Sequence, residues 1–341
     1  MRVAVINSGS SSLKFKLFDM RTEEVLHALI VENIGEKGSK IKTHHEALES
    51  LDVDFSSIDI IGHRVVHGGE EFSKPTIIDE GVIKTIEHLI PLAPLHNPAN
   101  LEGIIVARKK APDAIQIAVF DTAFHAQMPR EAYIYALPFE MYEKHKIRRY
   151  GFHGTSHSYL LKECAKVLNR EVKELNIITL HLGNGASACA IENGISIDTS
   201  MGFTPLEGLV MGTRCGDIDP AIVLYMQREL GLSITEIDNT LNKMSGLFGI
   251  CGSSDIRDIL DSQSEHSELA LEMMIRRVKK YIGAYMALLG RVDAIVFSGG
   301  IGENSTYIRG KIMQNNLAQE SHVLVIKTDE ELEIARQCLS F

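Results

Sequence analysis

Alternating apolar and polar stretches along the chain predict a mixed α/β protein, and one pattern occurs twice. An apolar run, a turn of Gly, Ser and Asn, and a second apolar run stand at residues 3–17 and again at residues 177–191. Two apolar runs joined by such a turn predict a β-hairpin. The copies, VAVINSGSSSLKFKL and IITLHLGNGASACAI, align without gaps at an offset of about 174 residues, and this spacing predicts a duplicated domain.

Each turn is suited to phosphate binding. Backbone N–H groups and small hydroxyl or amide side chains at a tight reversal form a cradle for an oxyanion. For either copy alone, an ordinary hairpin is the alternative, and the repetition favours the functional interpretation. Two facing cradles would suit a nucleotide held between two domains.

The remaining pattern predicts further strands and helices. Strands are predicted at 58–62, 115–121 and 322–326, helices at 82–92, 99–110, 156–168, 221–230, 234–243 and 269–289, and a connection at 129–138. A buried strand from 293 breaks into glycines and opens a helix, a common place to hold phosphate, with an ordinary loop as the alternative. Thr328 and Glu331 fit a capping box, which gives the acidic pair beside them a structural explanation.

Composition narrows the class of protein. A chain of 341 residues is long for a single core, which predicts two domains, and 45% apolar with 23% charged residues is typical of a soluble globular protein. No stretch approaches the roughly 18 apolar residues that span a bilayer. The N-terminus enters a strand without the features of a signal peptide. We therefore expect a cytoplasmic protein with no membrane partner.

Charge and cysteines exclude further classes. The formal net charge of −10 argues against nucleic acid as a partner, because backbone phosphates require a basic surface. The five cysteines are scattered, with no pair at metal-ligand spacing, and are interpreted as reduced thiols.

Between the predicted elements lie five segments rich in His, Arg, Asp and Gly. They are GHRVVHGGE (62–70), PLHNPAN (94–100), FDTAFH (120–125), RYGFHGTSH (149–157) and DTSMGFTPLEGLVMGTRCGDIDP (198–220). Glycine-flanked polar residues after strands usually mark the mouth of a site. We expect that site in a cleft between the two halves.

Histidines and arginines in these segments suggest two kinds of site. His63 and His67, like His153 and His157, stand four apart as metal ligands on a helix do, but flanking glycines and the lack of a following Glu favour hydrogen bonding within loops. Arg64 and Arg214 are each expected in a glycine-bearing loop. Two guanidinium groups converging on one cleft would hold a carboxylate and a phosphoryl group; a structural ion pair with a nearby Asp is the alternative for either one.

Ten segments in order resemble the acetate kinase family, from Asn7 to about Arg336. They are INSGSSSLKF, GHRVVHGGE, LAPLHNPAN, FDTAFH, GFHGTSH, HLGNGAS, DTSMGFTPLEGL, GTRCGDIDP, GGIGEN and TDEEL. The resemblance implies the duplicated actin-like, ribonuclease-H-like ATPase fold of the ASKHA superfamily, with two domains and an interdomain cleft. The expected domains are residues 1–125 with 332–341 as the N-terminal one and 126–331 as the nucleotide-binding one. The chain is shorter than family members usually are, near residues 35–45 and 316–322.

The resemblance also implies an activity, a carboxyl-acceptor phosphotransferase that moves a phosphoryl group reversibly between ATP and acetate by direct in-line transfer. It implies Mg²⁺, with Mn²⁺ as the alternative metal, ATP/ADP as co-substrate, acetate and acetyl phosphate as the other substrate pair, and a homodimer. Neither nucleic acid nor membrane is expected as a partner.

Site residues follow from the same resemblance. Arg64 and Arg214 would hold the carboxylate and the transferring group, His153 would donate to its equatorial oxygens, and Asp121 would lie beside Arg64 or the metal. Asn7 and Glu330 would flank Mg²⁺. The nucleotide-binding residues would be Ser10, Ser12, Lys14, His181, Leu182, Gly183, Asn184, Gly185, Asp255, Ile256, Arg257, Gly300, Ile301, Gly302, Glu303 and Asn304. Val66, Leu95, Phe152 and Pro205, together with Arg64, would bind the acetate.

Physical chemistry fits these roles. Acetate is already an anionic nucleophile, so no strong base is required, and a dissociative transfer is catalysed by positioning and by charge on the equatorial oxygens. Asp121 is therefore assigned an orienting or metal-organising role, with proton acceptor as the alternative.

Two other functions stay open. A kinase preferring propionate or butyrate would differ only in pocket volume, and Val66 and Phe152 favour acetate. An actin-like or chaperone-like ATPase would share the fold, but the phosphate loops of those proteins carry aspartates where Asn7 and His181 stand here.

Overall fold

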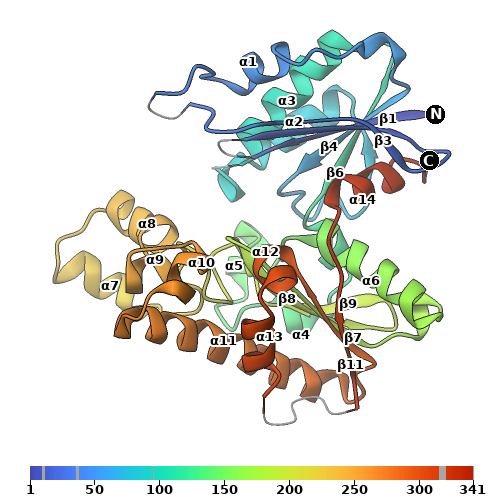
Figure 1. Cartoon of the computed structure of the whole chain (residues 1–341). Coiled ribbons are helices and arrows are strands. Elements are labelled where there is room, and N and C mark those ends of the chain that lie inside the picture. Colours follow the sequence, from blue (N-terminus) through green and yellow to red (C-terminus); the bar gives the residue numbers. More distant parts are fainter. Residues whose placement is uncertain (10–11, 36–37, 95, 315–319, 341) are drawn as a thin grey trace. The chain divides into compact units, whose positions relative to one another are not determined.

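The structure is a computed structural model that describes residues 1–9, 12–35, 38–94, 96–314 and 320–340. The chain forms two compact units, each built on its own β-sheet (Figure 1). The first unit comprises Met1–Ala126, Gly154–Tyr159 and Asp329–Phe341, and the second comprises Gln127–His153 and Leu160–Thr328. Compared with the expected domains, the first unit additionally includes Ala126, the beginning of a helix at Gly154, and residues 329–331.

The first unit is a six-stranded sheet of order β3-β2-β1-β4-β6-β5. Its strands are β1 (Arg2–Ser8), β2 (Leu13–Asp19), β3 (Glu24–Val31), β4 (Ile60–Val65), β5 (Thr76–Ile77) and β6 (Ile115–Phe120), and its helices are α1 (His44–Glu49), α2 (Glu80–His88), α3 (Asn97–Lys110) and α14 (Glu330–Gln337). Strand β1 is central, antiparallel to β2 and parallel to β4.

Helices cover both faces of this sheet (Figure 1). Alternate residues of β1 point to opposite faces: Val3 and Val5 pack in one core with Ile334 of α14, and Ala4 and Ile6 belong to a second core on the side of α1 and α3. Burial on both faces explains why β1 is an almost unbroken apolar run.

The second unit is a five-stranded sheet of order β11-β10-β7-β8-β9. Its strands are β7 (Ile177–Leu182), β8 (Ala186–Glu192), β9 (Ile195–Thr199), β10 (Ala294–Ser298) and β11 (His322–Val325), and its helices are α4 (Arg130–Tyr133), α5 (Glu140–His145), α7 (Ala221–Arg228), α8 (Ile234–Lys243), α9 (Gly246–Cys251), α10 (Ile256–Asp261), α11 (Glu265–Leu289), α12 (Gly299–Asn304) and α13 (Thr306–Ile312). Helix α6 (Gly154–Leu168) begins in the first unit and continues in the second.

The two sheets are copies of one arrangement. Each places a central strand between an antiparallel hairpin on one side and two successive parallel strands on the other. Each also has a register shift at the same point of its second strand, between Leu17 and Phe18 and between Ala190 and Ile191. The predicted duplication is confirmed.

The gap-free alignment of the two hairpins is wrong by one residue. In the first hairpin Ser8 pairs with Leu13, and in the second Leu182 pairs with Ala186, so the second turn is one residue shorter. A turn can lose a residue without disturbing the strands, because its residues make no ladder hydrogen bonds.

Several predicted elements are shifted. Strand β4 starts later than predicted and runs to Val65, so Arg64 lies in a strand and not in a glycine-bearing loop. The sheet accommodates the polar His63 because its buried Nε2 lies 2.8 Å from Gln116 Oε1. The 129–138 connection contains the short helix α4.

The predicted capping box at Thr328 is also wrong. Asp329 is the N-cap of α14, its carboxylate accepting from the Leu332 N–H at 3.0 Å. The Thr328 N–H instead donates to Glu303 at 3.2 Å.

Two other features bear on the sequence-based interpretation. All five cysteines are free thiols, and Cys164, Cys189 and Cys338 are buried. Among the helices that the structure describes, none is long and apolar enough to cross a membrane.

Candidate active site

The carboxyl ends of parallel strands bring Arg64 and Asp121 together in the first unit. Arg64 is the penultimate residue of β4, and Asp121 directly follows β6, its neighbour in the sheet. Arg64 Nε donates to Asp121 Oδ1 at 3.1 Å and Nη2 to Oδ2 at 2.5 Å, and the remaining nitrogen, Nη1, donates to Asn7 Oδ1 at 3.1 Å. The structural ion pair with an aspartate, which the sequence analysis gave as the alternative for either arginine, is therefore present at Arg64.

Asp121 is held from a second direction by the start of α6. Thr155 Oγ1 donates to Asp121 Oδ1 at 3.0 Å, and the Gly154 N–H donates to the Asp121 carbonyl at 2.9 Å. A Cβ at Gly154 would lie 2.2 Å from that carbonyl oxygen, so the close approach requires glycine. With donors on both oxygens, the carboxylate is fixed in orientation.

The environment keeps Arg64 charged. Burial acts to lower the pKa of its guanidinium, but the negative charges of Asp121 and then Glu330 outweigh burial and raise it. Arg64 is thus a permanent cation at the strand ends.

Asn7 links this pair to α14. Its Nδ2 donates to Glu331 Oε1 at 3.1 Å, and Lys16 Nζ lies 3.2 Å from the other Glu331 oxygen and 2.8 Å from Asp329. Burial acts to raise the pKa of Glu331, but the positive charges of Lys16 and Lys14 and the hydrogen bonds from Asn7 and Lys16 lower it below its ordinary value.

The predicted metal residues lie in this group. In the structure Asn7 is hydrogen-bonded to Glu331, whereas the neighbouring Glu330, the first residue of α14, contributes its charge to Arg64. An amide oxygen with carboxylates is the type of donor set that Mg²⁺ uses together with substrate phosphates, so these residues fit the ion. Among the described residues, no three His, Cys, Asp or Glu side chains form a metal cluster by themselves.

A second group of predicted residues gathers in the second unit. His153 precedes α6 with a φ of 56° in the left-handed region, its Nδ1 lies 2.9 Å from Ser187 Oγ, and its ring centroid lies 4.5 Å from that of His181. The i, i+4 arrangement of His153 and His157 on one helix face does not occur, because α6 begins after His153. His63 lies in β4, and His67 follows that strand.

Gly185 is the point where these side chains converge. A Cβ there would lie 3.4 Å from His153 Nε2 and 3.7 Å from Arg214 Nη1. The glycine therefore leaves room for both groups beside the hairpin turn of the second sheet.

Arg214 differs from Arg64 in having no acidic partner among the described residues. Its Nη1 donates to the Pro205 carbonyl at 3.2 Å, and none of the carboxylates that the structure describes forms an ion pair with it. Burial lowers the pKa of its guanidinium. A half-buried cation without a counter-ion among the described residues favours an anionic ligand.

The predicted nucleotide segments lie on two short helices and the second hairpin. Gly299 has a φ of 76°, and a Cβ there would lie 2.7 Å from the Leu182 carbonyl, so glycine allows α12 to approach the end of β7. Glu303 of α12 accepts from the Gly299 N–H at 3.0 Å, a structural contact. Asp255 caps α10 and pairs with the exposed Arg257 at 2.6 Å.

The predicted acyl pocket is only partly described. Val66 belongs to the first unit, and Phe152 and Pro205 belong to the second; Val66 and Phe152 are buried. Of the other predicted site residues, Lys14 is exposed, and Ser10 and Leu95 lie outside the described residues.

Sequence reasoning missed the residues that support these groups. Thr155 and Ser187 contact Asp121 and His153, and Asn97 and Asn100 hold the backbone at Val66 and His67. All four stand in the quoted motifs, so their segments were singled out, but a single sequence does not show which side chain contacts which.

The fold and the candidate site together define the class of protein. A sheet of one order present twice, each copy beginning with a β-hairpin, is the duplicated actin-like, ribonuclease-H-like ATPase fold. The sequence model of the acetokinase family matches residues 2–55 and 46–338. The chain belongs to the acetokinase family.

Individual relatives agree with this membership. The chain is 56% identical to an acetate kinase of Sulfurimonas denitrificans and 50% identical to one of Campylobacter concisus, covering 98% of the chain in both and 98% and 97% of the relatives. The Sulfurimonas alignment spans 380 residues, more than the 341 of the chain, so that relative has segments without a counterpart here.

Two solved structures have the same fold over almost the whole chain. An acetate kinase of Porphyromonas gingivalis superposes with a TM-score of 0.91 at 40% identity, and a propionate kinase of Francisella tularensis with 0.92 at 43%. Each comparison covers 98% of both chains.

Proposed function

We propose that the chain catalyses reversible, Mg²⁺-dependent phosphoryl transfer between ATP and acetate, giving ADP and acetyl phosphate. The observation that carries this proposal is Arg214, a half-buried guanidinium with no carboxylate partner among the described residues. An anionic substrate would supply the negative charge that balances the Arg214 guanidinium. Relatives that are acetate kinases share 56% and 40% of their residues with this chain, which supports the same activity.

The reaction needs few groups. An acetate oxygen attacks the γ-phosphorus of ATP, the bond from that phosphorus to the β,γ-bridging oxygen breaks, and ADP leaves with the electron pair. The transition state concentrates negative charge on the equatorial oxygens, which fixed donors stabilise. We assign this role to Arg64, Arg214 and His153 Nε2.

The contacts of His153 and Asp121 support their roles. Ser187 Oγ lies 2.9 Å from His153 Nδ1, and a Cβ at Gly185 would lie 3.4 Å from Nε2, so the imidazole is held with Nε2 beside the hairpin turn proposed for phosphate. Asp121 is bonded to both Arg64 and Thr155, which supports an orienting role over that of a proton acceptor.

Asn7 and Glu330 would hold Mg²⁺, with Glu331 beside them. The bound ion would neutralise charge on the ATP phosphates. Lys14, Ser10, Ser12, residues 181–185, residues 255–257 and residues 300–304 are proposed for the nucleotide, and Val66, Leu95, Phe152 and Pro205 for the acetate methyl group.

Propionate is the second candidate substrate, because the Francisella structure with the same fold is a propionate kinase. Acids differing by one methylene are separated by about 1–3 kcal/mol in an apolar pocket. An actin-like ATPase is disfavoured, since the amide of Asn7 occupies the hairpin position at which an aspartate would activate water.

A trapping assay tests the activity. Protein, ATP and Mg²⁺ are mixed with acetate, propionate or butyrate, and hydroxylamine converts any acyl phosphate to a hydroxamate. We expect hydroxamate with acetate at the highest kcat/KM. A higher value with propionate would reassign the substrate, and ADP without hydroxamate would indicate an ATPase.

Loss of either arginine tests the site. We expect Arg64→Ala and Arg214→Ala each to lower kcat by about 10²-fold or more, the scale seen when one transition-state donor is removed. The exposed Arg21, which pairs with Asp19, is the control, and Arg21→Ala should keep the wild-type kcat. Near-wild-type turnover of both site variants would contradict the transition-state role assigned to Arg64 and Arg214.

We also propose that the protein is a cytoplasmic homodimer. Helix α7 and its flanks expose an unusual number of large apolar side chains, which marks an interaction surface. They are Ile222, Leu224, Tyr225, Leu230 and Ile234. The free state of all five thiols suits a reducing compartment.

A further inference from the structure

One long loop carries two of the residues proposed for substrate. Residues 200–217, between β9 and α7, contain Pro205 and Arg214, and Arg214 Nη1 donates to the Pro205 carbonyl at 3.2 Å. The loop has no helix or strand of its own. Its conformation therefore depends on two sets of interacting side chains, each made of residues of the loop and residues outside it.

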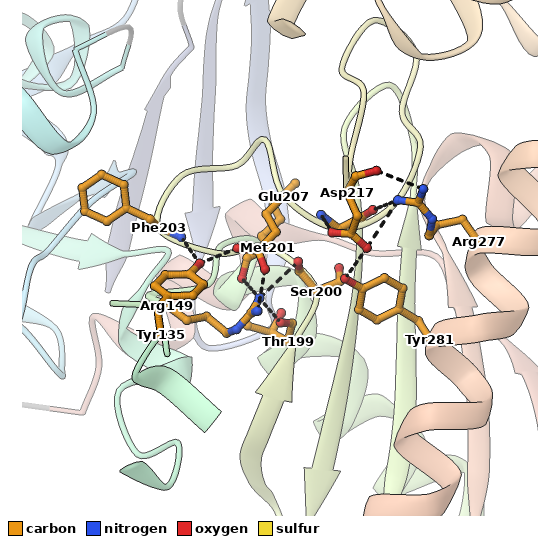
Figure 2. Close-up of polar contacts among 11 residues, drawn as sticks. Tyr135, Arg149, Thr199, Ser200, Met201, Phe203, Glu207, Asp217, Arg277 and Tyr281 are labelled. Atoms are coloured by element: carbon orange, nitrogen blue, oxygen red, sulfur yellow. Dashed lines mark hydrogen bonds and ion pairs between the residues drawn. The ribbon is translucent and has the colours of Figure 1, made fainter. Parts of the chain in front are cut away.

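The first set of such side chains is the Arg149 cluster, Arg149 with Tyr135 and Glu207 (Figure 2). Arg149 Nη1 lies 2.9, 3.3 and 3.1 Å from the carbonyl oxygens of Thr199, Ser200 and Met201, and its Nη2 pairs with Glu207 at 2.6 Å. One guanidinium thus ties the beginning of the loop to its middle.

Tyr135 completes this cluster. Its hydroxyl donates to Glu207 Oε2 and accepts from the Phe203 N–H, the latter at 2.9 Å. A Cβ on Gly202 would overlap both Glu207 and Tyr135. The backbone three residues before Pro205 is therefore packed against the cluster with no free space.

The second set is the Asp217 cluster, Asp217 with Arg277 and Tyr281 of α11 (Figure 2). Asp217 accepts from the Gly208 N–H at 2.8 Å and from Tyr281 at 2.9 Å, and Arg277 donates to the Gly208 and Asp217 carbonyls at 2.8 and 3.1 Å. Since Gly208 is joined to the end of the loop, residues 209–216 form a closed lobe that contains Arg214.

The Arg149 cluster also reaches the segment of His153. Arg149 lies four residues before His153, and the N–H groups of Tyr150 and Gly151 both donate to the Gly202 carbonyl, at 3.0 and 3.2 Å. The chain leading to His153 and the chain leading to Pro205 are thereby joined.

We propose that Arg149, Glu207 and Tyr135 are positioning residues that fix His153, Pro205 and Arg214 relative to one another. The proposal rests on the roles given to those three residues above. A lysine at 149 keeps the charge but lacks the planar fork that reaches several acceptors at once. Because a displacement of about 1 Å costs on the order of 10²-fold in rate, the cluster controls turnover without touching substrate.

Three variants test the proposal. We expect Arg149→Lys and Glu207→Gln to lower kcat by about 10-fold or more. Tyr135→Phe removes the hydroxyl that binds Phe203 and Glu207, and so loosens the backbone leading to Pro205. It should therefore raise KM for acetate about 5-fold and change KM for ATP by less than about 2-fold. It should also alter the preference for acetate over propionate.

Arg170→Met is the matched control. Arg170 forms an ion pair with Asp293 at 2.9 Å in the same unit, and its second guanidinium nitrogen donates to the Glu174 carbonyl, so both partners lie outside the loop. Its loss should lower the thermal midpoint as the cluster variants do, and leave both KM values unchanged. Should Arg149→Lys fail to fold, Tyr135→Phe alone decides through the split between the two KM values.

The outcomes separate the two proposals. If His153→Ala and Arg214→Ala keep wild-type turnover, the assigned catalytic roles fail. If those two lose activity while all three cluster variants behave like Arg170→Met, the site stands and the positioning role is overturned.

Discussion

Arg64 and Arg214 are both arginines, but their side chains lie in different electrostatic environments. Arg64 is neutralised by Asp121 and lies near Glu330, whereas Arg214 contacts a carbonyl and has no described carboxylate partner. In the sequence both stand near glycines in polar segments, and either could have been paired. Which one is paired depends on the neighbour that the sheet and the loop bring to it, so the sequence alone left the question open.

Asn100 joins the backbone after β4, at Val66, to the end of β1, at Ser8, through one side-chain amide. Its Oδ1 accepts from the Val66 N–H at 3.0 Å, and its Nδ2 donates to the Ser8 carbonyl at 2.7 Å. We expect Asn100→Ala to destabilise the fold by about 2–3 kcal/mol, since it leaves two buried backbone groups unpaired, and to raise KM for acetate. Urea unfolding and steady-state kinetics measure both effects.

The control for this variant is Asn242 on α8, an exposed amide that bonds Asp238. Asn242→Ala should change stability by less than about 0.5 kcal/mol. An Asn100→Ala protein as stable as this control would refute the bridging role of Asn100.

At the scale of elements, the sequence predicted most helices and strands of the described chain and located them within a few residues. Helix α8 is found as predicted, and α3 and α11 start two and four residues early. The shifts occur where side chains outside the element decide the boundary, as at β4, where Gln116 pairs with a buried His63. Periodicity alone carries no information about such a partner.

The first turn of α6 gives an element-scale prediction. A Cβ at Gly154 would overlap the Asp121 backbone, so Gly154→Ala should push the helix start away from Asp121, weaken the Thr155 hydrogen bond and lower kcat by about 10-fold or more. Gly283 of α11 has open space around a Cβ, and Gly283→Ala should instead raise stability by about 0.5–1 kcal/mol with unchanged kcat. Equal kinetics in the two variants would contradict the argument.

Asp293 gives a second prediction at this scale, because it joins the starts of β7 and β10. Its carboxylate accepts from the Asn176 N–H at 2.8 Å and pairs with Arg170 at 2.9 Å. Burial acts to raise its pKa, but these hydrogen bonds and the charges of Arg170 and Arg291 lower it below the ordinary 3.8. A lowered pKa adds stability above about pH 4 that is lost as the pH falls through the folded value.

We therefore expect Asp293→Asn to cost about 1–2 kcal/mol of unfolding free energy at pH 7 and progressively less below pH 4. Urea unfolding at pH 7, 5 and 3.5 measures the difference from wild type. The exposed Asp113 is the control, and Asp113→Asn should follow wild type at every pH. A difference that stays constant down to pH 3.5 would count against a depressed pKa.

At the scale of the whole molecule, the chain comprises two units with one architecture and different side chains at equivalent positions. Asn7 and His181 are the penultimate residues of the equivalent strands β1 and β7 of the two hairpins. Asn7 binds Arg64 and Glu331, whereas His181 lies beside His153. Duplication explains the two similar sheets, and divergence explains the different side chains at their equivalent positions.

Oligomeric state is the prediction for this scale. We expect the wild-type chain to elute with twice the mass of one chain in size-exclusion chromatography with light scattering. Leu224→Glu puts a charge on the exposed apolar face of α7 and should shift the protein to monomer. Val167→Glu alters an equally exposed side chain on α6 and should leave the dimer intact. A monomeric wild type would end the homodimer proposal.

The sequence by itself determined the class of fold, the duplication and the segments that carry the chemistry, because strand periodicity, turn residues and ten ordered motifs are local properties of the chain. Only the tertiary structure decided that the hairpins differ by one turn residue, that Asp329 caps α14, that Arg64 pairs with Asp121 while no described carboxylate pairs with Arg214, and that Arg149 fastens a distant loop. The turn length and the cap are choices among alternatives that the local sequence leaves open. The pairing of Arg64 and the contacts of Arg149 join residues far apart in sequence, and their free energy comes from burial and geometry that no local pattern records.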